Sequence, residues 1–160
     1  MLTLLVAATV PSVRALVFAL DPRTFVALHL TRVVGLAFLV LYGRGELPFA
    51  FAVYGGWGDI LVATLAGVLL IAVGPPVTPA RRRLFAGWNL LGLADILGVV
   101  LTAGRLGLAD PSSMAALGWF PLSLLPTFLV PLIIVTHVLL AVRLAHLSRG
   151  GRRRSRDQAG

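Results

Sequence analysis

Six ionisable residues lie within long apolar stretches of the sequence, where charged groups are rare. They are two arginines, two aspartates and two histidines: Arg14, His29, Arg32, Asp59, Asp95 and His137. In lipid such groups are costly, so they usually face one another or a water-filled cavity, and they often mark ion or proton pathways. Imidazoles and carboxylates exchange protons, and a guanidinium balances carboxylate charge. These residue types therefore point to proton or ion transfer.

The sequence around these residues is too apolar for a soluble globule. Of 160 residues, 58% are hydrophobic and 12% are charged, whereas a soluble domain carries about 25% charged residues. Each apolar stretch approaches the roughly 20 residues that a membrane-crossing helix needs, and unbroken runs of this length indicate helices rather than barrel strands. The five stretches are 2–20, 25–42, 49–73, 84–103 and 122–142. The sequence therefore predicts an all-α integral membrane bundle of five transmembrane helices within residues 1–147.

The first stretch is the least regular of the five, because it contains Pro11 and Arg14. It lacks a basic start and a small-residue cleavage site, so we expect a retained helix and not a signal peptide.

Three Xaa-Pro pairs predict where helices begin. In Asp21-Pro22, Thr78-Pro79 and Asp110-Pro111, an oxygen-bearing side chain precedes a proline. Such a side chain accepts a backbone N–H at a helix N-terminus, where the proline needs no donor. The first two pairs open the second and fourth spans, and the third opens a short segment at 111–119.

The arginines predict the orientation of the bundle. All 14 basic residues are Arg, and they concentrate in the loops 21–24 and 74–83 and in the tail after residue 142. Cytoplasmic loops carry such an excess, so we expect the N-terminus outside and the C-terminus in the cytoplasm. The net charge of +8 is therefore a topology signal and does not indicate nucleic-acid binding. The tail, 148–160, is expected to be a disordered cytoplasmic segment, either a solvated anchor or a segment that lies on anionic lipid.

The polar residues within spans fall on faces that predict a cluster. His29 and Arg32 are three residues apart and share one side of their helix. Asp59 lies on a stripe of small residues, which lets helices approach closely, and Asp95 has glycines three residues to either side. We expect Arg32, Asp59, Asp95 and His137 to form one buried polar cluster, with His29 as an additional member.

Several interpretations of this cluster remain open. Arg32 could bridge one or both aspartates and fix the helix packing, or the cluster could serve as a proton relay or coupled transport site. A metal site built on the histidines and aspartates, or a haem held between His29 and His137, is also conceivable. The histidines and aspartates are spread in depth by more than about 10 Å and none pair at ligand spacing on one helix, so no metal is expected. Two single histidines on different helices are a poor signal for haem, so no haem is expected either. The chain has no Cys, and no hydrolase, phosphate-loop or zinc-protease motif is present, so an enzyme is not expected either.

The region from Arg32 to His137 resembles a group of small uncharacterised bacterial multi-pass membrane proteins. The resemblance rests on Arg32-Val33-Val34-Gly35, Gly45-Glu46-Leu47-Pro48 with Phe49 and Phe51, Gly58-Asp59-Ile60, Trp88-Asn89-Leu90-Leu91-Gly92 with Asp95, and Phe128-Leu129-Val130-Pro131 ahead of His137. It implies a multi-pass helical protein of the bacterial inner membrane and brings no activity with it.

The function expected from these residues is transport or proton coupling through the buried cluster. The alternative is a non-catalytic structural or accessory subunit of a membrane protein complex. The expected partners are the lipid bilayer and other membrane proteins or further copies of this chain, because little of the sequence lies outside the spans.

Overall fold

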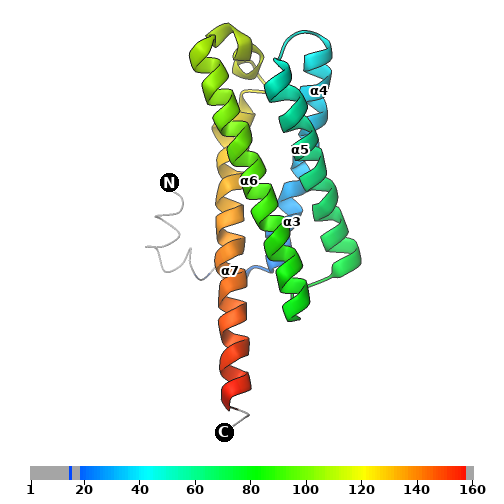
Figure 1. The fold of residues 1–160 in the computed structure, drawn as a ribbon, viewed down its shortest axis with the longest axis vertical. Coiled ribbons are helices and arrows are strands. Elements are labelled where there is room, and N and C mark those ends of the chain that lie inside the picture. Colours follow the sequence, from blue (N-terminus) through cyan, green and yellow to red (C-terminus); the bar gives the residue numbers. More distant parts are fainter. Residues whose placement is uncertain (1–14, 16–18, 158–160) are drawn as a thin grey trace.

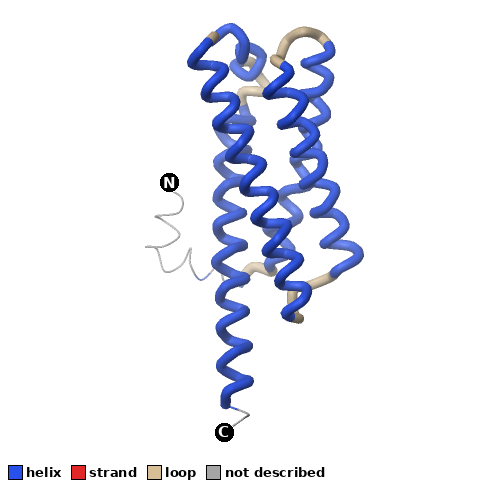
Figure 2. The backbone as a smooth tube through the Cα atoms, viewed as in Figure 1, coloured by secondary structure: helices blue, strands red, loops and turns tan. Residues whose placement is uncertain are grey.

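The described chain is a bundle of long helices lying side by side (Figure 1). The computed structural model describes residue 15 and residues 19–157. No strand occurs in this part of the chain, and loops are confined to the two ends of the bundle (Figure 2). The all-α prediction is therefore confirmed for the described residues.

Four polypeptide segments make up the bundle, and most of them combine two helix types. The first joins α3 to α4 through a 3₁₀ helix, η1, and the second ends in a π-helical turn, η2. The fourth begins with another π-helical turn, η4, and a short 3₁₀ helix, η3, precedes it. The elements are α3 (Pro22–Leu28), η1 (His29–Val34), α4 (Gly35–Gly43), α5 (Phe49–Val68), η2 (Leu69–Val73), α6 (Pro79–Ala109), η3 (Pro111–Gly118), η4 (Leu125–Leu129) and α7 (Val130–Asp157).

Four helical segments of the described chain are long and apolar enough to cross a membrane. They are Pro22–Gly43, Phe49–Val73, Pro79–Ala109 and Leu125–Ser148. Large apolar side chains also cover the outside of the bundle: Ile71 and Leu108 are each 89% exposed. This exterior is compatible with a membrane protein. The fifth expected span, 2–20, lies almost wholly outside the described residues, as does Arg14.

Two helices run further than the sequence predicted. Helix α6 continues through Ala109, although the chain from residue 104 was expected to be loop. Helix α7 continues through Asp157, so the segment 148–157 is helical where disorder was expected. Arginine is a good helix former, and extending an existing helix avoids the cost of nucleating a new one.

The three predicted helix starts are confirmed by their caps. Asp21 accepts from the Arg23 backbone N–H, and Thr78 accepts from the Arg81 backbone N–H. Asp110 accepts from the Ser112 backbone N–H at 3.0 Å and from the Ser112 hydroxyl at 2.6 Å. The Ser112 hydroxyl, followed by that backbone N–H, holds the pKa of Asp110 below its usual value.

The 3₁₀ helix η1 determines which side chains enter the bundle. With three residues per turn, side chains three apart lie in line along the helix. His29, Arg32 and Gly35 have this spacing, and all three are buried. Runs of 3₁₀ helix longer than about four residues are uncommon. The conformation of η1 thus places two ionisable side chains on one line facing the bundle interior.

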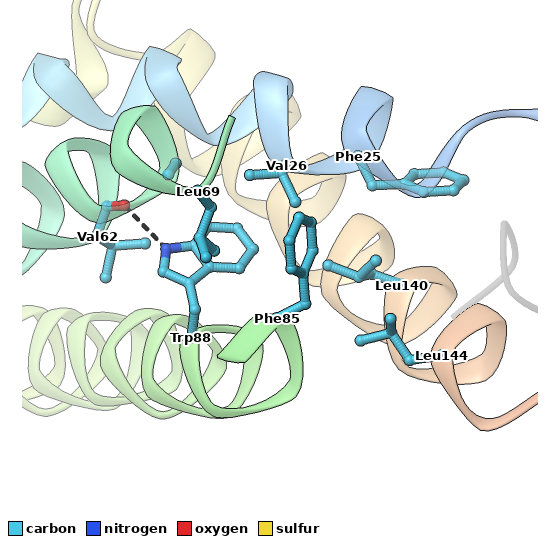
Figure 3. Close-up of a cluster of buried hydrophobic side chains, with 9 residues drawn as sticks. Phe25, Val26, Val62, Leu69, Phe85, Trp88, Leu140 and Leu144 are labelled. Atoms are coloured by element: carbon cyan, nitrogen blue, oxygen red, sulfur yellow. Dashed lines mark hydrogen bonds between the residues drawn. The ribbon is translucent and has the colours of Figure 1, made fainter. Parts of the chain in front are cut away.

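The buried residues form two apolar layers with a polar layer between them. One apolar layer contains Phe85 and Trp88, with residues from α3, α5 and α7 around them (Figure 3). The other contains Phe38 and Phe51 near the opposite end. On α5, Asp59 lies between Val62 of the first layer and Ala52 of the second. The polar side chains are therefore enclosed by packed hydrocarbon on both sides.

Two glycines allow α4 and α5 to cross at close range. A Cβ atom at Gly35 would lie 2.5 Å from the Gly56 carbonyl oxygen, and one at Gly56 would lie 2.8 Å from the Gly35 carbonyl oxygen. In both cases the nearest atom is a backbone oxygen of the other helix. Helices α4 and α5 would therefore have to move apart to accommodate a side chain at either glycine. This crossing lies immediately beside Arg32 and Asp59 and sets how closely their helices approach.

Candidate functional site: a buried arginine between two aspartates

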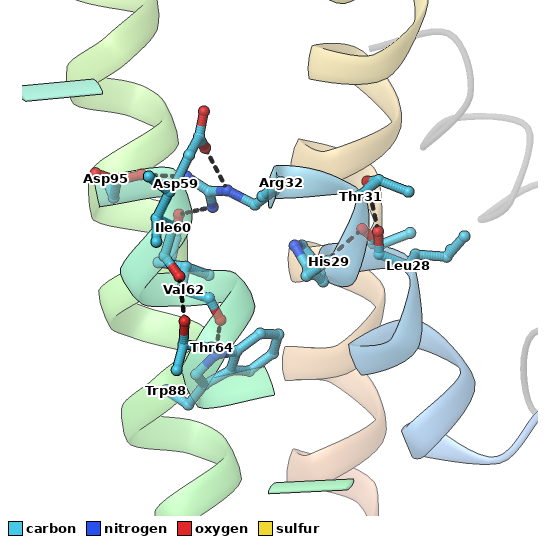
Figure 4. A network of polar contacts seen from close by, with 12 residues as sticks. Leu28, His29, Thr31, Arg32, Asp59, Ile60, Val62, Thr64, Trp88 and Asp95 are labelled. Atoms are coloured by element: carbon cyan, nitrogen blue, oxygen red, sulfur yellow. Dashed lines mark hydrogen bonds and ion pairs between the residues drawn. The ribbon is translucent and has the colours of Figure 1, made fainter. Parts of the chain in front are cut away.

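Arg32 lies at the centre of the polar layer and connects three segments of the bundle. Its Nε–H donates to Asp59 Oδ1 at 2.6 Å, its Nη1 donates to the Gly92 carbonyl oxygen at 3.0 Å, and its Nη2 donates to Asp95 Oδ2. Figure 4 shows the guanidinium of η1 reaching the carboxylates of α5 and α6. Arg32 is fully buried. Arg32 therefore bridges both aspartates, as the packing interpretation of the cluster requires.

The two carboxylates differ in their exposure to the surroundings. The Asp59 side chain is 6% exposed and the Asp95 side chain is 18% exposed. Asp95 also lies against Gly58, whose missing side chain makes room for it, because a Cβ atom there would overlap the carboxylate. With both carboxylates ionised, this triad carries one more negative than positive charge. An unbalanced charge of this kind is costly in a dry interior.

A pair of histidines lies on the other side of Arg32. His29 and His137 are both fully buried, and their ring centroids are 4.1 Å apart. Trp88 packs edge-on against His29, with ring centroids 5.1 Å apart, and its indole N–H donates to the Val62 carbonyl oxygen. The Gly92 backbone separates this pair from the carboxylates: a Cβ atom there would lie 2.6 Å from His137 Cε1.

The hydrogen bonds assign a different tautomer to each histidine. The Asn89 amide donates to the His137 backbone carbonyl, so its Oδ1 accepts from His137 Nδ1–H at 2.8 Å. The Thr136 hydroxyl donates to the Ile133 carbonyl, so it accepts from His29 Nε2–H at 3.2 Å. His29 Nδ1 then holds a lone pair and has no hydrogen-bond partner among the described residues. His137 Nε2 lies against the Gly92 backbone. Each neutral ring thus keeps one nitrogen able to accept a proton.

Two cavities reach the carboxylate side of the polar layer. The central cavity, about 170 Å³, has apolar walls that include Phe38 and Leu129, and Arg32 and Asp59 also line it. The lateral cavity, about 340 Å³, opens between α5 and α6 and is lined by Asp95 together with Thr102 and Tyr54. Asp95 is therefore the carboxylate that lines the wider and more polar of the two cavities.

The structure brings the expected cluster residues together in one layer. Arg32, Asp59 and Asp95 are in direct contact, and His137 adjoins them across Gly92. His29, expected only as an additional member, is fully buried against His137. The sequence predicted that the histidines and aspartates differ in membrane depth, but in the structure they lie in one layer.

The arrangement bears on the two cofactor interpretations. The His29 and His137 rings contact each other, which leaves no space for a porphyrin between them. Within the described residues, no group of three or more His, Asp or Glu side chains is placed to hold a metal ion. Two imidazole nitrogens able to accept a proton are present instead, and they suit proton exchange.

Sequence reasoning missed the neutral residues that orient the histidines. Asn89 was not among the expected cluster residues, but its amide bonds both the ring and the backbone of His137. Thr136, which directly precedes a candidate residue, fixes His29 instead. One available signal was Asn89 itself, because an amide within a span usually has a partner on another helix.

Comparison with known proteins places the chain in a family without adding an activity. No curated protein and no solved structure matches it. A family model described as a domain of unknown function, DUF8737, matches residues 1–145. This match covers most of the sequence, including every residue of the polar layer. The chain therefore belongs to the DUF8737 family.

Proposed function

We propose that this chain is a multi-pass protein of a bacterial inner membrane, with five spans, its N-terminus outside and its C-terminus in the cytoplasm. Four membrane-compatible helices and an apolar exterior support the membrane assignment. The concentration of arginines supports the orientation, because the loop between α5 and α6 and the C-terminal segment lie toward the same end of the bundle (Figure 1). The lateral cavity then lies toward the outside.

Within that membrane, the Arg32–Asp59–Asp95 triad binds and releases a proton as part of a proton-coupled transport step. The observation that carries this proposal is the charge imbalance of the triad together with the position of Asp95 on the lateral cavity. A bound proton neutralises the extra carboxylate charge, and the cavity gives that carboxylate access to water. Neutralising Asp95 also weakens its hold on the Arg32 guanidinium, which links proton binding to helix packing.

A chain of polar groups continues from the triad toward the inner end of the bundle. Gly92 accepts from Arg32 and adjoins His137, and His137 in turn bonds Asn89. Asn89 lines a groove between α6 and α7 on the side opposite to the lateral cavity. The ring nitrogens His29 Nδ1 and His137 Nε2 provide proton acceptors along this route. The proposed route therefore runs from Asp95 to the two buried histidines, and Asn89 holds the His137 ring in place.

A structural or accessory role is the second candidate, and one observation favours it. Arg32 alone ties η1, α5 and α6 together, and the Gly35–Gly56 crossing packs the same helices tightly. A subunit needing only a rigid bundle to contact other membrane proteins or its own copies would use the same contacts. The buried network then serves assembly and exchanges no proton.

Proton flux into proteoliposomes separates the two candidates. A potassium diffusion potential drives protons inward, and a trapped pH-sensitive dye reports their arrival. The wild-type chain should acidify the lumen faster than protein-free vesicles, and Asp95→Asn should abolish the difference. Asp110→Asn is the matched control, because Asp110 is an exposed carboxylate outside the helices.

The outcomes distinguish the proposals clearly. Well-assembled Asp95→Asn protein that conducts like the wild type contradicts the proton-binding role. Failure of both Asp59→Asn and Asp95→Asn to assemble, while Asp110→Asn assembles normally, favours the structural role. Assembly is measured by monodispersity and thermal unfolding in detergent.

A further inference from the structure

A large groove lies on the arginine-rich half of the bundle, between α6 and α7. Its volume is about 850 Å³. Its apolar walls come from both helices, with Leu90 and Leu93 on α6 facing Ala141 and Leu144 on α7. At the end nearest the loop before α6, the lining changes to Arg82, Arg83 and Ser148. The groove is therefore amphipathic along its length, with a basic mouth and a hydrocarbon floor.

The charge at the mouth is not balanced by any acidic side chain of the groove lining. Arg82 donates only to backbone carbonyls, namely Pro76 at 3.2 Å, Val77 at 2.9 Å and Leu147 at 2.8 Å. These bonds attach α7 to the loop before α6 and leave the charge of Arg82 uncompensated. Arg83 is exposed and makes no hydrogen bond or ion pair with a described residue.

The dimensions of the groove match one acyl chain beneath a headgroup. From Arg83 to Leu93 the helix rises about 15 Å, roughly half of the 30 Å hydrocarbon thickness. A lipid with its phosphate at the arginines would lay its chain along the apolar walls of one leaflet. Basic pockets between membrane helices on the cytoplasmic side bind anionic headgroups in this way.

We propose that this groove binds an anionic phospholipid, with its phosphate held by Arg82 and Arg83. This site goes beyond the proton-binding triad and does not depend on it. Asn89, which bonds the His137 ring, also lines the groove.

Native mass spectrometry of the full chain in detergent tests the proposal. The probes are phosphatidylglycerol and phosphatidylcholine with identical acyl chains, added in equal amounts. The wild-type chain should retain phosphatidylglycerol preferentially. Arg83→Gln should weaken that binding about fivefold, the contribution of one arginine at an anionic lipid surface. Arg83→Lys should keep most of the preference because it keeps the charge.

Two matched controls isolate the groove. Arg44→Gln removes an exposed arginine from the loop at the opposite end and should leave the preference unchanged. Ala86→Trp places a ring in the groove and should block retention, whereas Leu108→Trp adds the same ring to an exposed position further along α6. Thermal unfolding checks that each variant is folded.

Three results would overturn the proposal. The first is equal retention of the two lipids, and the second is an equal effect of Arg83→Gln and Arg44→Gln. The third is a full chain that binds neither lipid, which would assign the groove to another segment of this chain or to a second copy.

Discussion

The Arg32 Nε–H group donates to Asp59 Oδ1 at 2.6 Å, and the bundle encloses both side chains almost completely. The same guanidinium also binds Asp95 on a third segment. Removing one partner of a buried ion pair destabilises a protein far more than replacing the whole pair with apolar residues does, because the remaining charge is left without a partner. The stability of the bundle should therefore depend strongly on this one side chain.

Replacing Arg32 with leucine should lower the free energy of unfolding by about 3–5 kcal/mol. The loss should shrink when Asp59→Asn and Asp95→Asn are added, since neutral amides then replace both unpaired carboxylates. Arg32→Lys should fall between these cases, because an ammonium group lacks the planar fork that serves both carboxylates. Thermal unfolding in detergent measures the series. Equal stability of Arg32→Leu and the wild type would contradict this account.

Gly58 of α5 and Gly92 of α6, which adjoin the polar layer, should tolerate alanine far less well than Gly98 of α6 does. Alanine at Gly92 would press on His137, and alanine at Gly58 would press on Asp95. Overpacking of this kind costs about 1–3 kcal/mol. Gly98→Ala is the control: nothing lies within 4 Å of its added Cβ atom, and alanine favours the helix by about 1 kcal/mol. Unfolding temperatures that rank Gly98→Ala together with the other two would refute the packing argument.

The two buried histidines should have opposite tautomers. Their hydrogen bonds assign Nδ1–H to His137 and Nε2–H to His29. Nitrogen-15 NMR of ring-labelled protein distinguishes the tautomers by the shifts of the two ring nitrogens. His146→Gln removes the third histidine from the spectrum, and Asn89→Ala should disturb the His137 signals while sparing those of His29. Identical tautomers at both sites would contradict the assigned network.

The proposed orientation predicts which loops face the outside. The chain has no Cys, so single cysteines can be introduced without removing others. Glu46→Cys, in the loop between α4 and α5, should react with an impermeant maleimide added to intact cells. Val77→Cys, which is 61% exposed in the loop before α6, should react only after the membrane is opened. The reverse labelling pattern would show that the bundle has the opposite orientation in the membrane.

The sequence predicted the helix starts and the membership of the polar cluster, and each has a physical reason. A cap such as Asp21 or Thr78 acts on backbone groups within three residues, so local sequence suffices. Ionisable residues within apolar spans have few partners besides one another, so Arg32, Asp59 and Asp95 were expected to meet.

The unpredicted features depend on packing between segments. The first segment changes from α-helix to 3₁₀ helix at His29, where η1 begins. No residue type at that point indicates the change. The close crossing of α4 and α5 pairs Gly35 with Gly56, whereas the stripe of small residues identified from the sequence was the one that contains Asp59. The partners of His29 and His137 also come from other segments. Such contacts follow from how helices rotate against each other, which spacing along one helix does not reveal.

The central claim is that Asp95 takes up a proton, and infrared difference spectroscopy tests it most directly. A protonated carboxylic acid has a carbonyl band separate from that of a carboxylate, so spectra of the reconstituted chain across a pH series report its protonation without requiring a substrate. All carboxyl groups of the chain contribute carbonyl bands when they are protonated. We predict one reversible, pH-dependent carbonyl component that is lost in Asp95→Asn and persists in Asp110→Asn. Spectra of the wild type and of folded Asp95→Asn that show the same carbonyl changes would contradict the claim.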